Sequence, residues 1–222
     1  ANRLEVLAAL SNLAVSLGRY ELMVHTERRR LDLLQPDGAR WTTAMTRLAN
    51  GYERLGRLRE AINTLEILVD RSDTDDARRR YLERIAINAS QLGDHVPAVE
   101  AFDRLIALGN ADWQAYEGLG QALRAMGDCA RAVEAFREAR QRGGSTSHLY
   151  SGYCYDTMDD PGLAIAHLNA GRHAPDADLP PVLRVNVLET LGFLYAESNQ
   201  HGRAAAAWQE ALAIAARPDI RL

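Results

Sequence analysis

A short turn signal, Leu or Met followed by Gly, recurs through the chain in the middle of stretches with helical periodicity. It occurs at Leu17-Gly18, Leu55-Gly56, Leu92-Gly93 and Met126-Gly127, with weaker counterparts at Met158-Asp159 and Ser198-Asn199. The intervals between these turns are 38, 37, 34, 32 and 40 residues. Gly, Asp and Asn tolerate the left-handed backbone that allows one helix to stop and the next to begin. The spacing therefore predicts repeated helix-turn-helix units rather than one globular core.

The residues after each turn predict a second helix with a fixed packing face. Asp94, Asp128 and Asp160 follow three of the turns and can accept hydrogen bonds from the first exposed amides of that helix. Further on, a small residue precedes a bulky one by one helical turn, so that both lie on the same face. These pairs are Ala61 and Leu65, Ala98 and Phe102, Ala132 and Phe136, Ala164 and Leu168, and Ala204 and Trp208.

This pattern resembles the tetratricopeptide repeat (TPR) family. The fourth unit matches it best, through Tyr116, Leu119-Gly120, Leu123, Gly127, Ala132, Phe136 and Ala139. The first unit departs from it, because Met23, Glu27 and Arg30 replace the small, large and small residues of its second helix. The fifth unit departs at Ser151-Gly152 and at Gly171.

The resemblance implies an all-α, right-handed superhelical solenoid of about six TPR units, whose first helices line a concave surface. We expect one domain over residues 1–222, with units near 4–37, 42–75, 79–111, 113–144, 145–178 and 185–218. Helix-like sequence runs almost to both ends, and no polar capping helix closes the last unit. We therefore expect the chain to be a segment of a longer protein.

Composition argues against several classes of partner and cofactor. All 26 basic residues are arginine, the formal net charge is −4, and no overall positive field favours nucleic acid. No apolar run approaches the roughly 20 residues of a membrane-spanning helix, so we expect no direct membrane insertion. The six histidines lack the spacing of a helical zinc site, and no Gly-x-Ser-x-Gly motif occurs. We expect no metal, no cofactor and no enzymatic activity.

The two cysteines leave two interpretations open. Cys129 opens the second helix of the fourth unit, and Cys154 lies late in the first helix of the fifth. Because adjacent helices run antiparallel, both fall towards the same end of the stack. A disulfide in an oxidising compartment and two buried free thiols are both compatible with this placement.

The remaining signal is the predicted groove. In TPR proteins, positions on the first helix of each pair line the concave surface. Here those positions hold Asn12, Arg47, Asn50, Arg54, Arg80 and Arg84 in units one to three, and Gln121, Arg124, Tyr150, Tyr153 and Phe193 in units four to six. The guanidinium groups can form paired bonds with carboxylates, or salt bridges with neighbouring acids such as Glu53. The aromatic side chains suit peptide side chains or sugar rings.

One TPR subclass, the chaperone-binding carboxylate clamp, grips an acidic C-terminal peptide. Asn12, Arg80 and Arg84 match its basic and Asn positions, whereas Ala8 and Arg47 stand where Lys and Asn are expected. The resemblance to this subclass is therefore incomplete.

We expect a non-catalytic scaffold that binds another protein or peptide. The lysine-free, alanine-rich composition suggests a GC-rich bacterial genome. Variable repeat lengths, degenerate units and uncapped ends resemble the long TPR arrays of outer-membrane exopolysaccharide export proteins of the Pel, cellulose or poly-N-acetylglucosamine type, and this resemblance implies a periplasmic segment of such a protein. There it would recruit a polymer-modifying enzyme or guide the polysaccharide. The alternative is a cytoplasmic TPR adaptor that binds an acidic or C-terminal peptide through an arginine-lined groove.

Overall fold

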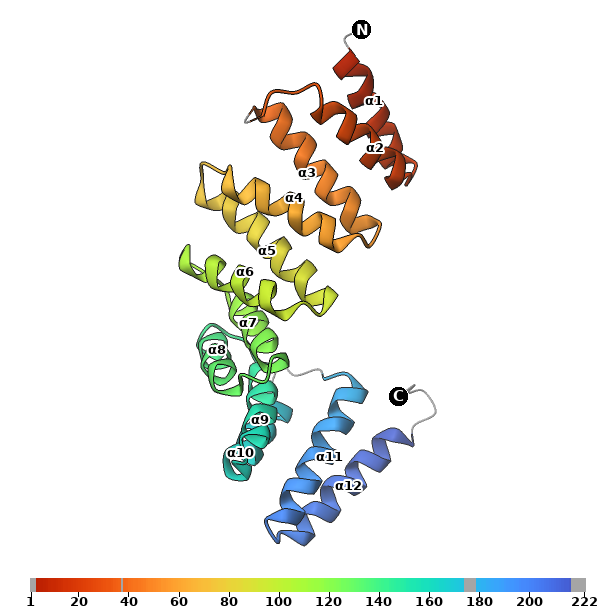
Figure 1. Ribbon diagram of the computed structural model, residues 1–222. Helices are drawn as coiled ribbons and strands as arrows, with labels where there is room; N and C mark the ends of the chain where they lie inside the picture. The colour runs from red at the N-terminus through yellow and green to blue at the C-terminus, as the bar shows by residue number, and fades with distance from the viewer. Residues whose placement is uncertain (1–2, 37, 174–178, 217–222) are drawn as a thin grey trace. The chain divides into compact units, whose positions relative to one another are not determined.

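The computed structural model describes residues 3–36, 38–173 and 179–216, and over these residues it contains twelve α-helices and no strand (Figure 1). The predicted all-α repeat fold is confirmed. The chain divides into two compact units, Ala1–Ala111 and Asp112–Leu222, each with three helix pairs. The single domain and the right-handed superhelix expected from the sequence stay predictions.

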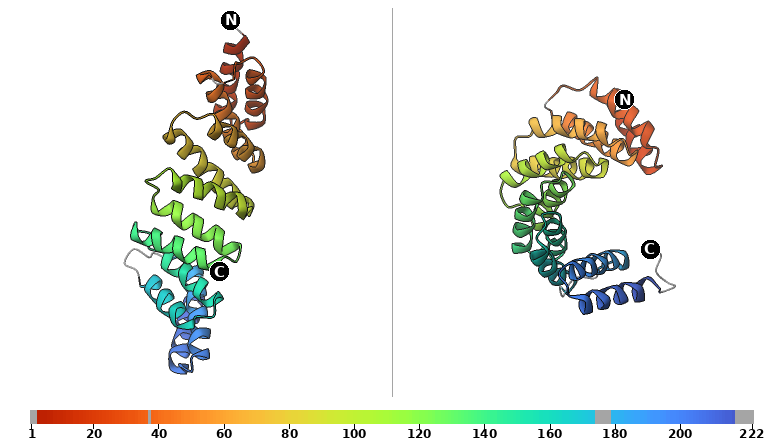
Figure 2. Two further views of the ribbon diagram at one scale, coloured as in Figure 1. Left: turned by 60° about the vertical axis from the view of Figure 1, so that its left-hand side comes forward. Right: turned by 60° about the horizontal axis from the view of Figure 1, so that its bottom comes forward.

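Each helix pair corresponds to one predicted repeat. The first unit contains α1 (Arg3–Ser16), α2 (Tyr20–Leu31), α3 (Ala39–Arg54), α4 (Leu58–Asp70), α5 (Asp75–Leu92) and α6 (His95–Ala107). The second unit contains α7 (Trp113–Ala125), α8 (Cys129–Gln141), α9 (Ser147–Thr157), α10 (Pro161–Arg172), α11 (Pro181–Glu197) and α12 (His201–Ala215). Within each unit every helix packs against the next one along the chain, and Figure 2 shows this order from two further directions. None of the described helices is both long and apolar enough to cross a membrane.

The turn inside each pair has the backbone conformation that the sequence predicts. Gly18, Gly56, Gly93 and Gly127 have φ between 65° and 82°. Asp159 and Asn199 replace glycine in the last two pairs and adopt φ of 59° and 57°. The prediction that these two weaker signals also mark turns is confirmed. Asp and Asn can replace glycine here because they tolerate this left-handed region better than other non-glycine residues.

The small and bulky residues of each second helix form the contact between the helices of a pair. Ala132 and Phe136 are both fully buried, and the Phe136 ring lies over Gly120 of α7. A Cβ atom at Gly120 would overlap that ring. Leu168 covers Gly152 in the same way, which explains the Ser151-Gly152 departure in the fifth repeat as an ordinary helix contact.

The predicted helix caps are confirmed in two of three cases. The Asp128 and Asp160 carboxylates accept hydrogen bonds from the backbone amides of Arg131 and Leu163. Asp94 makes no side-chain capping bond, so that prediction is wrong. The backbone amide of Asp94 donates to the Ala89 carbonyl and closes the turn from the preceding helix, as the backbone amides of Asp128 and Asp160 do in their own turns.

Candidate binding pocket

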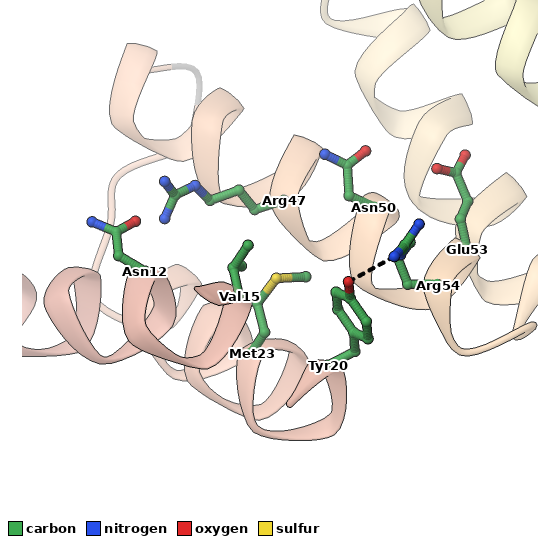
Figure 3. A pocket seen from close by; sticks show the side chains of 8 residues that line it. All are labelled: Asn12, Val15, Tyr20, Met23, Arg47, Asn50, Glu53 and Arg54. Atoms are coloured by element: carbon green, nitrogen blue, oxygen red, sulfur yellow. Dashed lines mark hydrogen bonds between the residues drawn. The ribbon is translucent and has the colours of Figure 1, made fainter. Parts of the chain in front are cut away.

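An open pocket of about 430 Å³ lies in the first unit between the end of α1, the start of α2 and the second half of α3 (Figure 3). Four of the predicted groove residues line it, and four further residues complete its wall. The lining residues are Asn12, Val15, Tyr20, Met23, Arg47, Asn50, Glu53 and Arg54.

Helical spacing brings the polar lining residues to one face. Arg47, Asn50 and Arg54 are separated by three and four residues along α3, so their side chains project from one side of the helix. Asn12 occupies the same place on α1 that Asn50 occupies on α3, six residues before the turn glycine. Figure 3 shows the Arg47 side chain extending from α3 towards Asn12 on α1.

A buried carboxylate stands behind Arg47. Glu27 on α2 is 0% exposed, and both its oxygens accept hydrogen bonds from the Arg30 guanidinium at 2.8 and 2.7 Å. The Ser11 hydroxyl also donates to Glu27. Arg47 lies 3.6 Å from the same carboxylate. One buried negative charge is therefore shared between two guanidinium groups, and Arg30 has the shorter contacts.

A second carboxylate joins α3 to α5. Glu53 accepts two hydrogen bonds from Arg84, at 3.0 and 2.9 Å, and a third from the Asn88 side-chain amide at 2.9 Å. Arg84 also donates to the Asn50 side-chain oxygen at 2.5 Å. The salt bridge expected between a groove arginine and Glu53 is present. The Arg84 guanidinium is therefore bound to side chains of the protein itself and is not available as a bidentate site for the carboxylate of a ligand.

Arg54 has a neutral partner. It donates a hydrogen bond to the Tyr20 hydroxyl at 2.9 Å, and its guanidinium carbon lies 5.0 Å from the Tyr20 ring centroid. Figure 3 marks this contact at one end of the pocket. No carboxylate of a described residue pairs with Arg54. Its charge is consequently exposed to whatever occupies the pocket.

The charges around the pocket do not balance. Arg30, Arg47, Arg54 and Arg84 carry four positive charges, while Glu27 and Glu53 carry two negative charges. The local excess of two positive charges resides mainly on Arg47 and Arg54, because the other two arginines have close carboxylate partners. Guanidinium groups placed this way favour a carboxylate or another anion.

The pocket also offers apolar surface next to these charges. Met23 is 2% exposed and lies between α1 and α3, while Val15 on α1 is 45% exposed. The side-chain amide of Asn12 supplies a donor and an acceptor suited to a peptide backbone, and Asn50 supplies the donor of its amide nitrogen, since its oxygen accepts from Arg84. The combination fits a short peptide segment that carries acidic groups and at least one aliphatic side chain.

Sequence reasoning missed some of these residues. Tyr20 was not predicted, because its contact with Arg54 joins two helices that the repeat pattern treats independently. Glu27 and Arg30 were noticed only as departures from the pattern, yet their spacing of three residues was a usable signal of a helical ion pair. Arg80, which was predicted, is exposed on α5 and does not line the pocket.

The groove residues predicted in the second unit form two separate groups. In one, the Arg124 guanidinium lies 5.9 Å from the Tyr150 ring centroid, and Tyr150 stacks on Phe136 at 5.6 Å. Burial raises the pKa of the neighbouring Tyr153 to about 12, so this phenol stays protonated at neutral pH. Gln121, on the same helix as Arg124, is exposed.

The other group lies on α11 and α12. Phe193 is 63% exposed and meets the Trp208 ring edge-on, with centroids 5.6 Å apart. An exposed aromatic ring of this kind is a possible platform for a sugar ring or an apolar side chain. Trp208 and, in the first group, Tyr153 both pack against one buried hydrophobic cluster, which includes Leu191 and Tyr195.

Two histidines that follow no ligand-spacing motif in the sequence meet inside the second unit. The ring centroids of His148 on α9 and His167 on α10 are 5.4 Å apart, and Tyr155 lies 5.0 Å from His167. Burial and the nearby Arg140 guanidinium lower the pKa of both histidines. Both rings are therefore neutral at pH 7. No group of three or more potential metal ligands occurs among the described residues.

The two cysteines are buried free thiols. Cys154 lies close to Cys129, and burial together with that neighbour raises the pKa of Cys154 to about 12. At neutral pH this thiol is protonated and behaves as a small apolar side chain.

Comparison with known proteins relates these features to other chains. A family model described as tetratricopeptide repeat matches residues 46–112, 84–148 and 117–178, which together cover more than half of the chain. No curated protein matches significantly by sequence.

Several solved structures share the fold. The C-terminal part of a TPR repeat-containing protein from Cytophaga hutchinsonii has a TM-score of 0.78 at 18% identity, covering 98% of this chain and 86% of that chain. MamA from Desulfovibrio magneticus RS-1 has a TM-score of 0.69 at 17% identity, covering 81% of this chain and 97% of that chain. YrrB, a TPR protein with an unusual peptide-binding site, has a TM-score of 0.65 at 13% identity, covering 87% and 93%.

Proposed function

Because the chain belongs to the tetratricopeptide repeat family, its helix pairs form a protein-interaction scaffold, and we propose that the pocket between α1, α2 and α3 binds an acidic segment of a partner protein. The fold is typically non-catalytic. The observation that carries the proposal is the local excess of two positive charges at an open pocket, with Arg54 facing it without a carboxylate partner.

The geometry assigns distinct roles to the lining residues. Arg54 and Arg47 bind carboxylates of the partner, since their existing contacts leave positive charge unbalanced. Asn12 and Asn50 hydrogen-bond to the partner's backbone, and the exposed Val15 contacts an aliphatic side chain. That YrrB is a TPR protein with a peptide-binding site supports a peptide ligand on this fold.

Fluorescence anisotropy with two labelled peptides of equal length tests the proposal. One peptide is rich in Glu and has a free C-terminal carboxylate; the other replaces every Glu with Gln and has an amidated C-terminus. The chain should bind only the first, and added salt should weaken that binding because charge pairs at an open site are screened. Arg54→Ala should reduce affinity about tenfold or more, because a hydrogen bond to a charged group contributes about 1.5–3 kcal/mol.

Arg59→Ala is the matched control. Arg59 is an exposed arginine on α4 that does not line the pocket, so its removal changes the net charge of the protein equally. Equal losses for the two variants would mean that only the overall charge matters. Equal affinity for the Glu and Gln peptides would contradict the proposal outright.

A second candidate function places the scaffold in exopolysaccharide export. The observation that favours it is the exposed Phe193 ring beside Trp208, since sugar rings pack on exposed aromatic faces. In this function the chain is a periplasmic segment of an outer-membrane export protein of the Pel, cellulose or poly-N-acetylglucosamine type. It recruits a polymer-modifying enzyme or guides the polymer. A cytoplasmic adaptor for acidic peptides is the competing context.

Trp208 fluorescence tests the sugar-binding part of this candidate. Titration with cello-oligosaccharides or N-acetylglucosamine oligomers should change Trp208 emission, and Phe193→Ser should abolish the change. Trp41→Phe and Trp113→Phe in the background make Trp208 the only tryptophan, since the chain has three. No response to either sugar series would count against polymer contact. The gene sequence on either side of this chain tests the compartment, because an export protein requires a secretion signal.

A further inference from the structure

The two arginines that face the pocket with unbalanced charge lie at opposite ends of one row on α3. Arg47 and Arg54 are seven residues apart, which is close to two full helical turns, so both project from the same side of the helix. Because an α-helix rises 1.5 Å per residue, their Cα atoms are about 10.5 Å apart along its axis. Figure 3 shows Asn50 between them.

Existing contacts keep the two guanidinium groups apart. At one end of the row, Arg54 donates a hydrogen bond to the Tyr20 hydroxyl at 2.9 Å. At the other end, Arg47 lies 3.6 Å from the buried carboxylate of Glu27. A single carboxylate has both its oxygens on one carbon atom, so it cannot contact both arginines while these contacts persist. Each arginine therefore needs an anionic group of its own.

Both arginines retain N–H groups for such a contact. A distance of 3.6 Å is too long for a hydrogen bond, and Glu27 already accepts two hydrogen bonds from Arg30, at 2.8 and 2.7 Å. Arg54 uses one N–H group on the neutral Tyr20 hydroxyl and keeps the others. Two carboxylates on the ligand would thus balance the local excess of two positive charges.

The distance between the two ends of the row favours one conformation of a peptide ligand. In a polyproline II segment, residues i and i+3 lie on the same side and about 9.3 Å apart, because this helix has three residues per turn and rises 3.1 Å per residue. In a β-strand, residues on the same side lie about 6.7 Å apart at i and i+2, or about 13.4 Å apart at i and i+4. The polyproline II spacing matches the row on α3 better than either β-strand spacing.

A helical ligand fits the pocket less well. A helix is about 10–12 Å across with its side chains, so a segment long enough to reach both arginines fills roughly two to three times the pocket volume of about 430 Å³. A polyproline II segment is narrower, and its backbone N–H and C=O groups are not paired with each other. The side-chain amides of Asn12 and Asn50 can bond to those groups.

We infer that the pocket recognises two acidic residues three positions apart in a polyproline II-like segment, with one carboxylate on Arg47 and the other on Arg54. This inference rests on the function proposed above for the pocket, and it adds a sequence pattern, acid-x-x-acid, for the partner. The two intervening residues pass Asn50, whose amide nitrogen donates to a backbone carbonyl of the ligand because its oxygen is taken by Arg84.

Fluorescence anisotropy with three labelled peptides of equal length, composition and charge tests the spacing. Each peptide has two Asp residues in an alanine and proline background with blocked ends, and the second Asp follows the first by two, three or four positions. Asp is used because its side chain is shorter than that of Glu and compensates less for a wrong spacing. The peptide with a spacing of three should bind about tenfold more tightly than either of the others, because each of those loses a hydrogen bond between charged groups.

Protein variants identify which carboxylate each arginine binds. Two further peptides keep the spacing of three but replace one Asp or the other with Asn. Arg54→Ala should weaken binding of the peptide with two Asp residues about tenfold and leave the affinity for one of the Asn peptides unchanged. Arg47→Gln should do the same with the other Asn peptide.

The fold should survive both substitutions. Arg54 is exposed, and Arg47→Gln leaves the hydrogen bonds between Glu27 and Arg30 in place, which circular dichroism checks. Arg59→Ala is the matched control, because Arg59 is exposed on α4 and does not line the pocket. This variant should retain the preference for a spacing of three.

Three results would overturn the inference. Equal affinity for all three spacings would contradict recognition at two points, while a preference for acidic over neutral peptides would still support the function proposed for the pocket. Arg47→Gln without effect on the peptide with a spacing of three would mean that one anionic group is bound, at Arg54. Failure of every acidic peptide to bind, the Glu-rich peptide included, would contradict both the inference and the proposed function.

Discussion

Glu27 provides the sharpest test of how the first repeat is held together, and the change to make is Glu27→Leu. The carboxylate is 0% exposed, and the Arg30 side chain that it binds is 10% exposed. The substitution therefore leaves a buried guanidinium group without its counter-charge and leaves the buried Ser11 hydroxyl without its acceptor. Breaking a buried ion pair from one side costs about 3–5 kcal/mol, a large part of the roughly 5–15 kcal/mol that stabilises a typical domain.

The double variant Glu27→Leu with Arg30→Leu should recover part of that loss. The equivalent positions in the second repeat hold Leu65 and Leu68, which are 0% and 1% exposed, so leucine suits both places in this fold. Replacement of a whole buried ion pair by apolar residues is often neutral or stabilising. The double variant should therefore be more stable than the single one, and it should stay below the original chain by the cost of the buried Ser11 hydroxyl that has lost its acceptor, about 1–3 kcal/mol.

Equilibrium unfolding in urea measures both effects. Trp41 lies in the first unit, whereas Trp113 and Trp208 lie in the second, so a background with Trp113→Phe and Trp208→Phe reports on the first unit alone. This matters because two units need not unfold in one transition. A single variant as stable as the original chain would refute the reasoning, as would a double variant no more stable than the single one.

Three further predictions concern the second unit. Gly120→Ala should destabilise it by about 1–2 kcal/mol in urea unfolding, because overlap with the Phe136 ring outweighs the better helix propensity of alanine. Because the folded-state pKa values of His148 and His167 are lowered, the folded unit binds fewer protons than the unfolded chain below the usual histidine pKa of about 6.5. Its stability should fall as pH drops through that value, and His148→Gln with His167→Gln should flatten the dependence. Cys154, whose pKa is raised to about 12, should resist iodoacetamide at pH 8 until the chain is denatured, and rapid labelling in the native state would contradict its burial.

The repeat architecture could be predicted because its signals are local. A left-handed residue is required wherever one helix turns into the next, so Gly56 and its counterparts mark the pairs even when Asp159 or Asn199 takes their place. The small and bulky residues of each second helix follow from the same geometry. Asp94 was misread because an acidic residue at a helix start is compatible with capping but does not require it.

The details of the pocket depend on contacts between helices, which a repeat pattern does not specify. Asn12, Arg47, Asn50 and Arg54 line one pocket, and helical spacing explains why the three residues of α3 project to the same side. Their role in binding stays a prediction. The contact of Arg54 with Tyr20 spans 34 residues, and nothing in the repeat pattern indicates which groove arginine gains a neutral partner.

From the sequence alone, the pairing of Arg84 with an acidic side chain of the protein was one of two open alternatives. Its pairing with Glu53 was weighed against an open fork for a ligand, and the choice depends on side-chain geometry across two helices. The charge imbalance that supports a ligand follows from that choice. The sequence therefore predicts the face of the pocket, whereas the structure identifies which of its charges are available.

The central claim is that the first unit holds the ligand site, and NMR chemical-shift mapping of the isotopically labelled chain tests it most directly. Addition of the Glu-rich peptide should shift the backbone amides and side chains around Asn12, Tyr20, Asn50 and Arg54, while the Gln-substituted peptide leaves them unchanged. Shifts confined to the second unit, or shifts of equal size with both peptides, would contradict the claim.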